Sequence, residues 1–250
     1  MDKNNEYTQK GSRADIAEIE RFAKIADTWW DENGPFKALH AMNPPRIAFI
    51  YEQIIKHYPQ EGENIFAHLD ILDAGCGGGI LTEALYKKGA KLTGVDATEE
   101  SLNVAKAHAQ MNNLDIDYHL GLVDDMDDNH LFDIICSLEV VEHLPDVSGF
   151  LAALEKRLKP GGLIFISTIN RTPKAIVLAK YAAEYLLNLA PKGTHEWQKF
   201  VKPSELQTIA HHLNLEVKGI SGFKFYPLGN RWKLCRNVDM NYIICLQKPI

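Results

Sequence analysis

The chain has 250 residues, of which 46% are hydrophobic, and it carries a formal net charge of −6. This length fits one α/β domain with additions and is large enough for a substantial hydrophobic core. The acidic balance gives no broad electrostatic footprint for nucleic acid, so a nucleic-acid partner is not expected.

Cysteine usage and the N-terminus indicate the compartment. Cys76, Cys136, Cys235 and Cys245 are scattered without a C-x-x-C pair, which is typical of reduced thiols in a cytosolic protein. Several acidic residues near the N-terminus argue against a mitochondrial-type transit peptide, and no apolar stretch there suits secretion. No apolar run approaches the roughly 20 residues of a membrane span. We therefore expect a cytoplasmic protein.

Helical patterns dominate the first sixty residues after a polar start. Residues 15–30 place apolar side chains at helical spacing and predict a helix, which the polar and glycine-containing residues 31–35 end. Residues 42–45, Met-Asn-Pro-Pro, predict a turn. Because proline suits the first turn of a helix, a second helix is expected over residues 46–57.

The rest of the chain alternates between strand and helix patterns. Strands are predicted at residues 69–74, 91–96, 116–120, 132–137 and 162–168, with helices near 80–88, 99–112 and 147–158. This alternation predicts a doubly wound, mostly parallel sheet. Residues 159–162 predict a turn before the fifth strand, and residues 215–225 and 239–247 predict closing strands.

A glycine-rich turn follows the first predicted strand. The sequence Asp73-Ala-Gly75-Cys-Gly77-Gly-Gly lies between an apolar run and an amphipathic helix pattern. A strand that passes through glycines into a helix leaves backbone N–H groups free and lets a ligand approach closely. The motif predicts a nucleotide-type binding site, with Asp73, Gly75 and Gly77 as candidate binding residues.

The detail of this motif selects among nucleotide ligands. Ile80 replaces the third glycine of the dinucleotide fingerprint, which disfavours a dehydrogenase, and no Gly-Lys-Ser/Thr is present for a P-loop. The next predicted strand ends in Asp96, where a carboxylate can accept both hydroxyls of a ribose. The two motifs together resemble the class I methyltransferases, whose cofactor is S-adenosylmethionine. The alternative is a generic tight turn with an unrelated acid at a strand end.

Further segments narrow the resemblance to one family. They are Trp29-Trp-Asp, Asn43-Pro-Pro-Arg, Glu139-Val-Val-Glu-His, Ser167-Thr-Ile-Asn-Arg, Pro191-Lys-Gly-Thr-His and Val238-Asp-Met-Asn-Tyr. Over about residues 15–248 the chain resembles the ubiquinone-biosynthesis O-methyltransferases, which methylate hydroxyls of polyprenylated aromatic precursors. The resemblance implies a Rossmann-like domain over residues 61–250, with an inserted helical segment over 172–200. It also implies an N-terminal helical extension over residues 1–60 that closes over the cofactor site.

The resemblance also implies cofactor contacts at Arg46, Gly75, Asp96 and Leu138. Leu138 departs from the family, because bacterial relatives often have Met there, but an apolar or backbone contact should survive. Arg46 could reach the carboxylate of the methionine moiety, and the alternative is a surface arginine. Leu122 and Val123 could pack against the adenine, while the acids of residues 124–128 are expected in a solvated loop.

An acidic cluster follows the fourth predicted strand. Glu139, Glu142 and His143 are spaced i, i+3, i+4, which places them on one face if the turn is helical. Their ligand types suit Mg²⁺ or alternatively Zn²⁺, and the resembled family is thought to use a divalent metal at these positions. The alternative is that they shape the rim of the site, as a Glu-His pair does in class I methyltransferases that need no metal.

The expected chemistry requires a group that removes a proton. A phenol has a pKa near 10, so only about 0.1% is the nucleophilic anion at pH 7. A metal ion or a general base removes much of this cost. We therefore predict direct SN2 transfer from sulfur to oxygen, with Glu142 and His143 as metal ligands or as base. His195 is a second candidate base, and its alternative is a structural histidine in a loop.

The insertion carries an apolar stripe. Residues 174–191 place Leu178, Tyr181 and Tyr185 on one helical face and Lys180 opposite. A core helix shows the same pattern. The other interpretation is an interfacial helix on anionic lipid, which suits a substrate with a polyprenyl tail. The predicted partners are thus the polyprenyl phenol or catechol substrate, the inner face of the membrane through peripheral contact, and other ubiquinone-biosynthesis proteins.

Two rival functions remain at this point. A C- or N-methyltransferase of the same fold would act on another aromatic acceptor. A non-catalytic cofactor-binding scaffold of a biosynthetic complex would keep its function when Glu142 and His143 are replaced.

Overall fold

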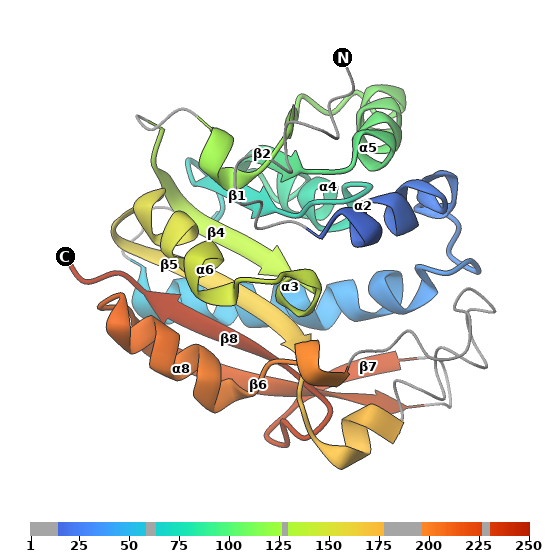
Figure 1. Ribbon diagram of the computed structural model, residues 1–250. Coiled ribbons are helices and arrows are strands. Elements are labelled where there is room, and N and C mark those ends of the chain that lie inside the picture. Colours follow the sequence, from blue (N-terminus) through green and yellow to red (C-terminus); the bar gives the residue numbers. More distant parts are fainter. Residues whose placement is uncertain (1–14, 59–63, 127–129, 178–196, 227–230) are drawn as a thin grey trace.

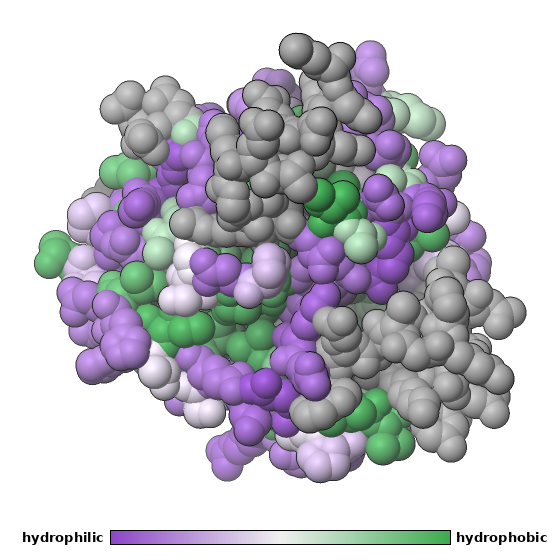
Figure 2. Space-filling view, in the orientation of Figure 1, coloured by the Kyte–Doolittle hydropathy of each residue, from purple (hydrophilic) through white to green (hydrophobic). Residues whose placement is uncertain are grey.

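The computed structural model describes residues 15–58, 64–126, 130–177, 197–226 and 231–250. Within them, one eight-stranded sheet carries helices on both faces (Figure 1). The strand order is β3-β2-β1-β4-β5-β8-β6-β7. On the face shown in Figure 2, hydrophilic residues dominate the surface. Hydrophobic residues gather where helices α6 (Val147–Lys156) and α8 (Pro203–His212) cover the sheet.

Five strands run parallel and three close the sheet in antiparallel fashion. The parallel strands are β1 (Asp70–Ala74), β2 (Lys91–Asp96), β3 (Asp117–Leu120), β4 (Phe132–Leu138) and β5 (Leu158–Ile169). The others are β6 (Glu216–Tyr226), β7 (Arg231–Cys235) and β8 (Asn241–Gln247), with β8 paired to β5 and β6. The predicted doubly wound, mostly parallel sheet is confirmed.

Helices and short 3-10 turns connect the strands. The helices are α2 (Ile16–Ala23), α3 (Lys37–His57), α4 (Ile80–Tyr86), α5 (Glu99–Met111), α6 (Val147–Lys156) and α8 (Pro203–His212). The 3-10 turns are η1 (Ala26–Thr28), η2 (Val123–Asp125), η3 (Val141–His143) and η4 (Trp197–Lys199). Residues 173–177 are also helical. No described helix is both long enough and apolar enough to cross a membrane.

The order in which parallel strands are added to the sheet reverses between β1 and β4. The chain moves outward from β1 to β2 and β3, then returns to β4 on the other side of β1. In open α/β sheets, a crevice for ligands forms at the carboxyl ends of the strands beside this reversal. The glycine turn, Asp96 and Glu139 all follow strands that end at this edge.

The hydrophobic core lies on both faces of the sheet. One cluster joins the sheet to α6 and α8 through residues such as Leu151 and Leu206. The other joins it to α3 and α4, with Phe49, Ile50 and Ile54 of α3 buried beside strand residues. Residues 37–57 are therefore continuous with the core of the sheet.

Three predicted boundaries are wrong. The predicted turn at residues 42–45 lies inside α3, because burial of this helix against the sheet outweighs the local cost of Pro44 and Pro45. The helix predicted over residues 15–30 stops at Ala23 and is followed by η1. The turn predicted at residues 159–162 is part of β5, where a register shift between Phe132 and Ile134 absorbs the extra residues.

Candidate active site

A cavity of about 550 Å³ lies at the carboxyl ends of the parallel strands. One wall comes from the glycine loop, the end of β2 and η2, including Gly75, Gly77 and Asp96. Another comes from the residues after β4, Leu138 to Leu144. Helix α2 and residues on either side of η1, such as Ile25 and Trp29, supply the remaining wall. The cavity is thus shared between the sheet and the segment that precedes it.

The glycine loop is covered by an aromatic side chain. Gly77 has φ +51°, and a Cβ built on it would lie 2.5 Å from the ring of Trp29. Trp29 itself lines the cavity, stacks on Phe36 with ring centroids 3.7 Å apart, and donates from Nε1 to Ser101 Oγ at 3.1 Å. Side chains at the loop positions would collide with this ring. Close contact between the loop and Trp29 therefore requires glycine there.

Asp96, the predicted ribose-binding residue, lines the cavity at the end of β2. Its two carboxylate oxygens accept from the backbone N–H groups of Gly77 and Thr98, each at 2.8 Å. Burial raises the pKa of Asp96, while these two N–H groups favour the ionised form. Each carboxylate oxygen keeps a second lone pair for a ligand hydroxyl. The neighbouring Leu122 and Val123 supply apolar surface suited to a base. This wall fits S-adenosylmethionine.

Two predicted cofactor-binding residues do not line the cavity. Asp73 is buried and accepts from Thr82 Oγ1 at 2.6 Å, and burial raises its pKa to about 6. Arg46 is buried and pairs with Glu139 at 2.8 Å, while its Nε atom has no hydrogen-bond partner among the described residues. Leu138 does line the cavity, beside Glu139. Asp73 and Arg46 thus support the cavity from behind its wall.

The acidic cluster after β4 is presented by an unusual backbone turn. Glu139 has φ +58°, a left-handed conformation that non-glycine residues seldom adopt and that is often found at functional sites. Glu142 and His143 belong to η3, and all three side chains reach the cavity wall. The turn is helical only over Val141 to His143, so Glu139 reaches the same cavity from a left-handed position before η3.

Each of these three residues has its own protein partner. Glu139 Oε1 accepts from Arg46 and from Ser167 Oγ at 2.7 Å. Buried Glu142 accepts from Thr168 Oγ1 at 2.7 Å. His143 Nδ1 lies 2.9 Å from Glu18 Oε2 of α2. Among the residues that the structure describes, no three His, Cys, Asp or Glu side chains group to hold a metal. The predicted Mg²⁺ or Zn²⁺ site is therefore not supported by the described residues.

Glu142 has a strongly perturbed acidity. Burial, and then the nearby charge of Glu139, raise the pKa of this carboxyl to about 7. A group with a pKa near the working pH suits a general base. His143 contacts Glu18 through Nδ1, its Nε2 has no hydrogen-bond partner among the residues that the structure describes, and the ring of Phe22 packs edge-on against it with centroids 5.3 Å apart. His195, the other predicted base, lies outside the described residues.

The family resemblance implied that residues 1–60 close over the cofactor site, but the sequence did not indicate which residues of α2 line the cavity. Glu18, Ile19 and Phe22 line the cavity opposite the residues after β4. The apolar spacing of residues 16–26 predicted a buried face but gave no indication of what that face covers. The Trp29-Trp30 pair was singled out only because it belongs to the segments that carry the family resemblance. No physical pattern in the sequence indicated that Trp29 lines the cavity.

The raised pKa of Glu142 predicts a specific dependence of stability on pH. The folded value is about 7 and the reference value is 4.5, so folding binds a proton between these pH values. The free energy of unfolding should therefore fall as pH rises from 4.5 through 7. Glu142→Gln cannot ionise, and we expect it to be more stable than wild type at pH 8 by up to roughly 3 kcal/mol.

Urea unfolding at pH 5.5 and pH 8 measures this difference. The gain in Glu142→Gln should shrink at pH 5.5, whereas the exposed control Glu52→Gln should show no such trend. An equal effect of Glu142→Gln at both pH values would mean that the carboxyl titrates normally.

Comparisons with known proteins agree with this geometry. A family model described as a methyltransferase domain matches residues 46–218. A ubiquinone biosynthesis O-methyltransferase of Pelagibacter ubique is 44% identical over 227 residues, covering 90% of this chain and 95% of that protein. Another, of Paramagnetospirillum magneticum, is 42% identical and covers 91% and 92% of the two chains.

Solved structures show the same fold at low sequence identity. A magnesium protoporphyrin IX methyltransferase of Synechocystis, with bound SAH, has a TM-score of 0.59 and 16% identity over 83% of each chain. A SAM-dependent methyltransferase of Thermotoga maritima has a TM-score of 0.61 and 14% identity, covering 92% and 98% of the chains. The fold is therefore that of the class I methyltransferases.

Proposed function

Because the chain belongs to the ubiquinone-biosynthesis O-methyltransferase family, we propose that it methylates a hydroxyl of a polyprenylated phenol or catechol, using S-adenosylmethionine. One observation carries the proposal. The same cavity is lined by Gly75 and Asp96 on one wall and by Glu142 and His143 on another. The residues proposed to bind the nucleoside and the residues proposed to accept a proton thus line one cavity.

The chain's own residues perform binding, orientation and proton removal. When bound, S-adenosylmethionine supplies a sulfonium methyl group that is already activated toward nucleophiles. Asp96 and the glycine loop hold the nucleoside end in place, which fixes the direction of the donated methyl group. The apolar wall from Phe22 and Leu144 suits an aromatic ring and limits access of water.

Proton removal is assigned to the acidic turn. With S-adenosylmethionine bound, the acceptor hydroxyl would have to lose its proton as its oxygen takes the methyl group, and Glu142 or His143 would receive that proton. The raised pKa of Glu142 leaves it able to hold that proton near neutral pH. Glu18 orients His143, and a carboxylate beside Nδ1 places the ring proton there and leaves Nε2 as acceptor. Glu139, already paired with Arg46, contributes charge rather than a proton site.

A membrane surface completes the proposal. The apolar stripe of residues 174–191, most of which lie outside the described residues, suits an interfacial helix that meets a substrate dissolved in the bilayer. Basic residues at its ends favour anionic lipid. Sedimentation with phosphatidylglycerol vesicles tests this part, and failure to sediment would assign the stripe to the protein core.

Methyl transfer to a short-prenyl catechol tests the proposed function. We expect the labelled methyl group of S-adenosylmethionine to appear on oxygen, as located by NMR of the product. Label on ring carbon would assign a C-methyltransferase, and absence of transfer despite cofactor binding would favour a scaffold. A parallel reaction with EDTA distinguishes the two roles predicted for the acidic turn: retained activity would leave Glu142 and His143 as base or rim of the site. Loss of activity with EDTA would restore the metal-site interpretation.

A further inference from the structure

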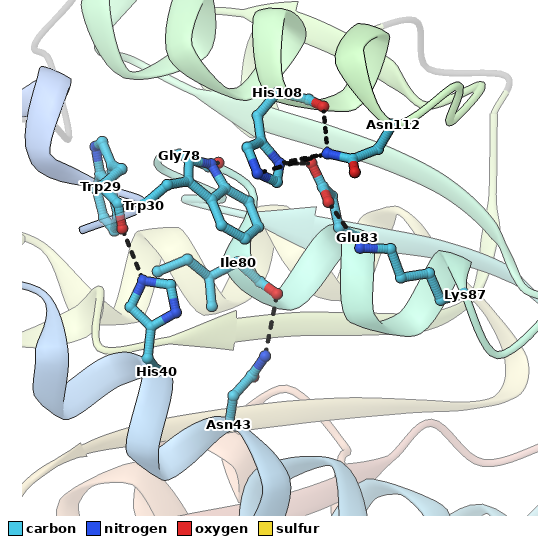
Figure 3. A network of polar contacts seen from close by, with 10 residues as sticks. All are labelled: Trp29, Trp30, His40, Asn43, Gly78, Ile80, Glu83, Lys87, His108 and Asn112. Carbon is cyan, nitrogen blue, oxygen red and sulfur yellow. Dashed lines mark hydrogen bonds and ion pairs between the residues drawn. The ribbon is translucent and has the colours of Figure 1, made fainter. Parts of the chain in front are cut away.

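Two rings lie flat against each other beside the glycine loop (Figure 3). The indole of Trp30 and the imidazole of His108 have centroids 3.5 Å apart and planes 8° from parallel. Trp30 also donates from Nε1 to the carbonyl of Gly78 at 2.9 Å. This tryptophan therefore joins three segments: the one that follows η1, the glycine loop, and helix α5. Neither ring belongs to the cavity wall.

The imidazole is fixed by a buried carboxylate. His108 Nδ1 lies 2.6 Å from Glu83 Oε1 of helix α4, and the Glu83 side chain is 1% exposed. The other oxygen of Glu83 pairs with Lys87 Nζ at 3.1 Å. Because an ionised carboxylate only accepts hydrogen bonds, Nδ1 carries a proton here. Glu83 thus sets the orientation of the ring on which Trp30 stacks.

The neighbouring Trp29 lies on the glycine loop and has contacts of its own. Trp29 covers Gly77 and Gly78, and its carbonyl oxygen lies 2.8 Å from His40 Nε2 of helix α3. Its backbone is continuous with that of Trp30, so the position of one limits the position of the other. Movement of Trp30 away from His108 would therefore break its hydrogen bond to Gly78 and remove one of the restraints on the backbone of Trp29.

We propose that Trp30, His108 and Glu83 are positioning residues for the cofactor site. The Trp30–His108 stack, fixed by Glu83, keeps Trp29 on Gly77 and Gly78 and so holds the loop in its binding conformation. A ligand that meets an ordered loop does not have to order it on binding, which increases affinity. The inference rests on the proposed S-adenosylmethionine site but not on the identity of the methyl acceptor.

Two variants separate the stack from its hydrogen bonds. His108→Gln keeps an amide donor for Glu83 but removes the flat ring, and Trp30→Phe keeps a ring but removes the donor to Gly78. We expect each variant to raise the dissociation constant of S-adenosylhomocysteine about tenfold through faster release. Amides of residues 26–36 and 75–79 should exchange hydrogen faster in the ligand-free protein. The turnover number at saturating S-adenosylmethionine should change less than about twofold, because the reacting groups are untouched.

Matched controls and a double variant make the test decisive. His119→Gln and Trp232→Phe change the same residue types in β3 and β7, away from the stack, and should bind S-adenosylhomocysteine like wild type. The double variant Trp30→Phe/His108→Gln should be less impaired than the product of the single effects, because the stack on His108 and the hydrogen bond to Gly78 both act through the position of one indole ring. Unchanged affinity and exchange in both single variants would overturn the role. Wild-type protein that fails to bind S-adenosylhomocysteine would instead overturn the proposed function.

Discussion

Replacing Asp96 by asparagine should weaken S-adenosylhomocysteine binding about 100-fold, measured by titration calorimetry. Both oxygens of Asp96 already accept from backbone N–H groups, and the cavity side offers their remaining lone pairs to a ribose. Hydrogen bonds to a charged group contribute about 1.5–3 kcal/mol each, so losing two charge-assisted contacts costs roughly 3 kcal/mol. The amide NH₂ would also face a backbone N–H and disturb the loop.

Asp117→Asn serves as the control for this experiment. Asp117 lies on β3 with an exposed side chain and makes no contact with the cavity. Its affinity for S-adenosylhomocysteine should match that of wild type. Near-normal binding by Asp96→Asn would mean that the ribose is held elsewhere, and the assignment of this wall would have to be abandoned.

Glu142→Gln and His143→Gln should each lower the turnover number, by about 10²–10⁴-fold for whichever residue is the principal base. The other residue should show a smaller loss, since the two side chains are adjacent in η3 and interact electrostatically. Affinity for S-adenosylhomocysteine should change little in either variant, because the nucleoside wall is separate. Initial rates with a short-prenyl catechol at saturating cofactor measure the effect.

The same Glu142→Gln variant is expected to be more stable at alkaline pH, as described above. Loss of activity together with increased stability is typical of a residue kept for chemistry rather than for folding. His119→Gln is the matched control for His143→Gln, because it lies at an exposed position on β3. Full activity in both Glu142→Gln and His143→Gln would show that proton removal occurs elsewhere, with His195 the next candidate.

The sequence allowed much of the nucleotide side of the site to be predicted. The turn after β1 and the acid at the end of β2 are set by local patterns, and a parallel sheet brings such strand ends to one edge. Gly75, Gly77 and Asp96 accordingly line the cavity. Asp73 belongs to the same motif as Gly75 and Gly77, but its side chain accepts a hydrogen bond from Thr82 and does not line the cavity. The orientation of this side chain depends on packing, which the spacing of the motif does not specify.

The other wall required tertiary structure. The pairing of Glu18 with His143 joins α2 to η3, and no local pattern specifies such a contact. The spacing of Glu139, Glu142 and His143 allowed a common helical face, but the left-handed backbone at Glu139 brings this residue to the same cavity from outside η3. Helix α8 and strand β7 were not predicted, and α3 continues through two prolines because its buried face is stabilised by the sheet.

The central claim is that one cavity holds the nucleoside against Asp96 and presents the methyl group to the acidic turn. A crystal structure of the complex with S-adenosylhomocysteine tests it most directly. We predict both ribose hydroxyls on Asp96 and the sulfur atom directed toward the space beside Glu142 and His143. A ribose bound away from Asp96, or a sulfur atom directed away from that turn, would contradict the account.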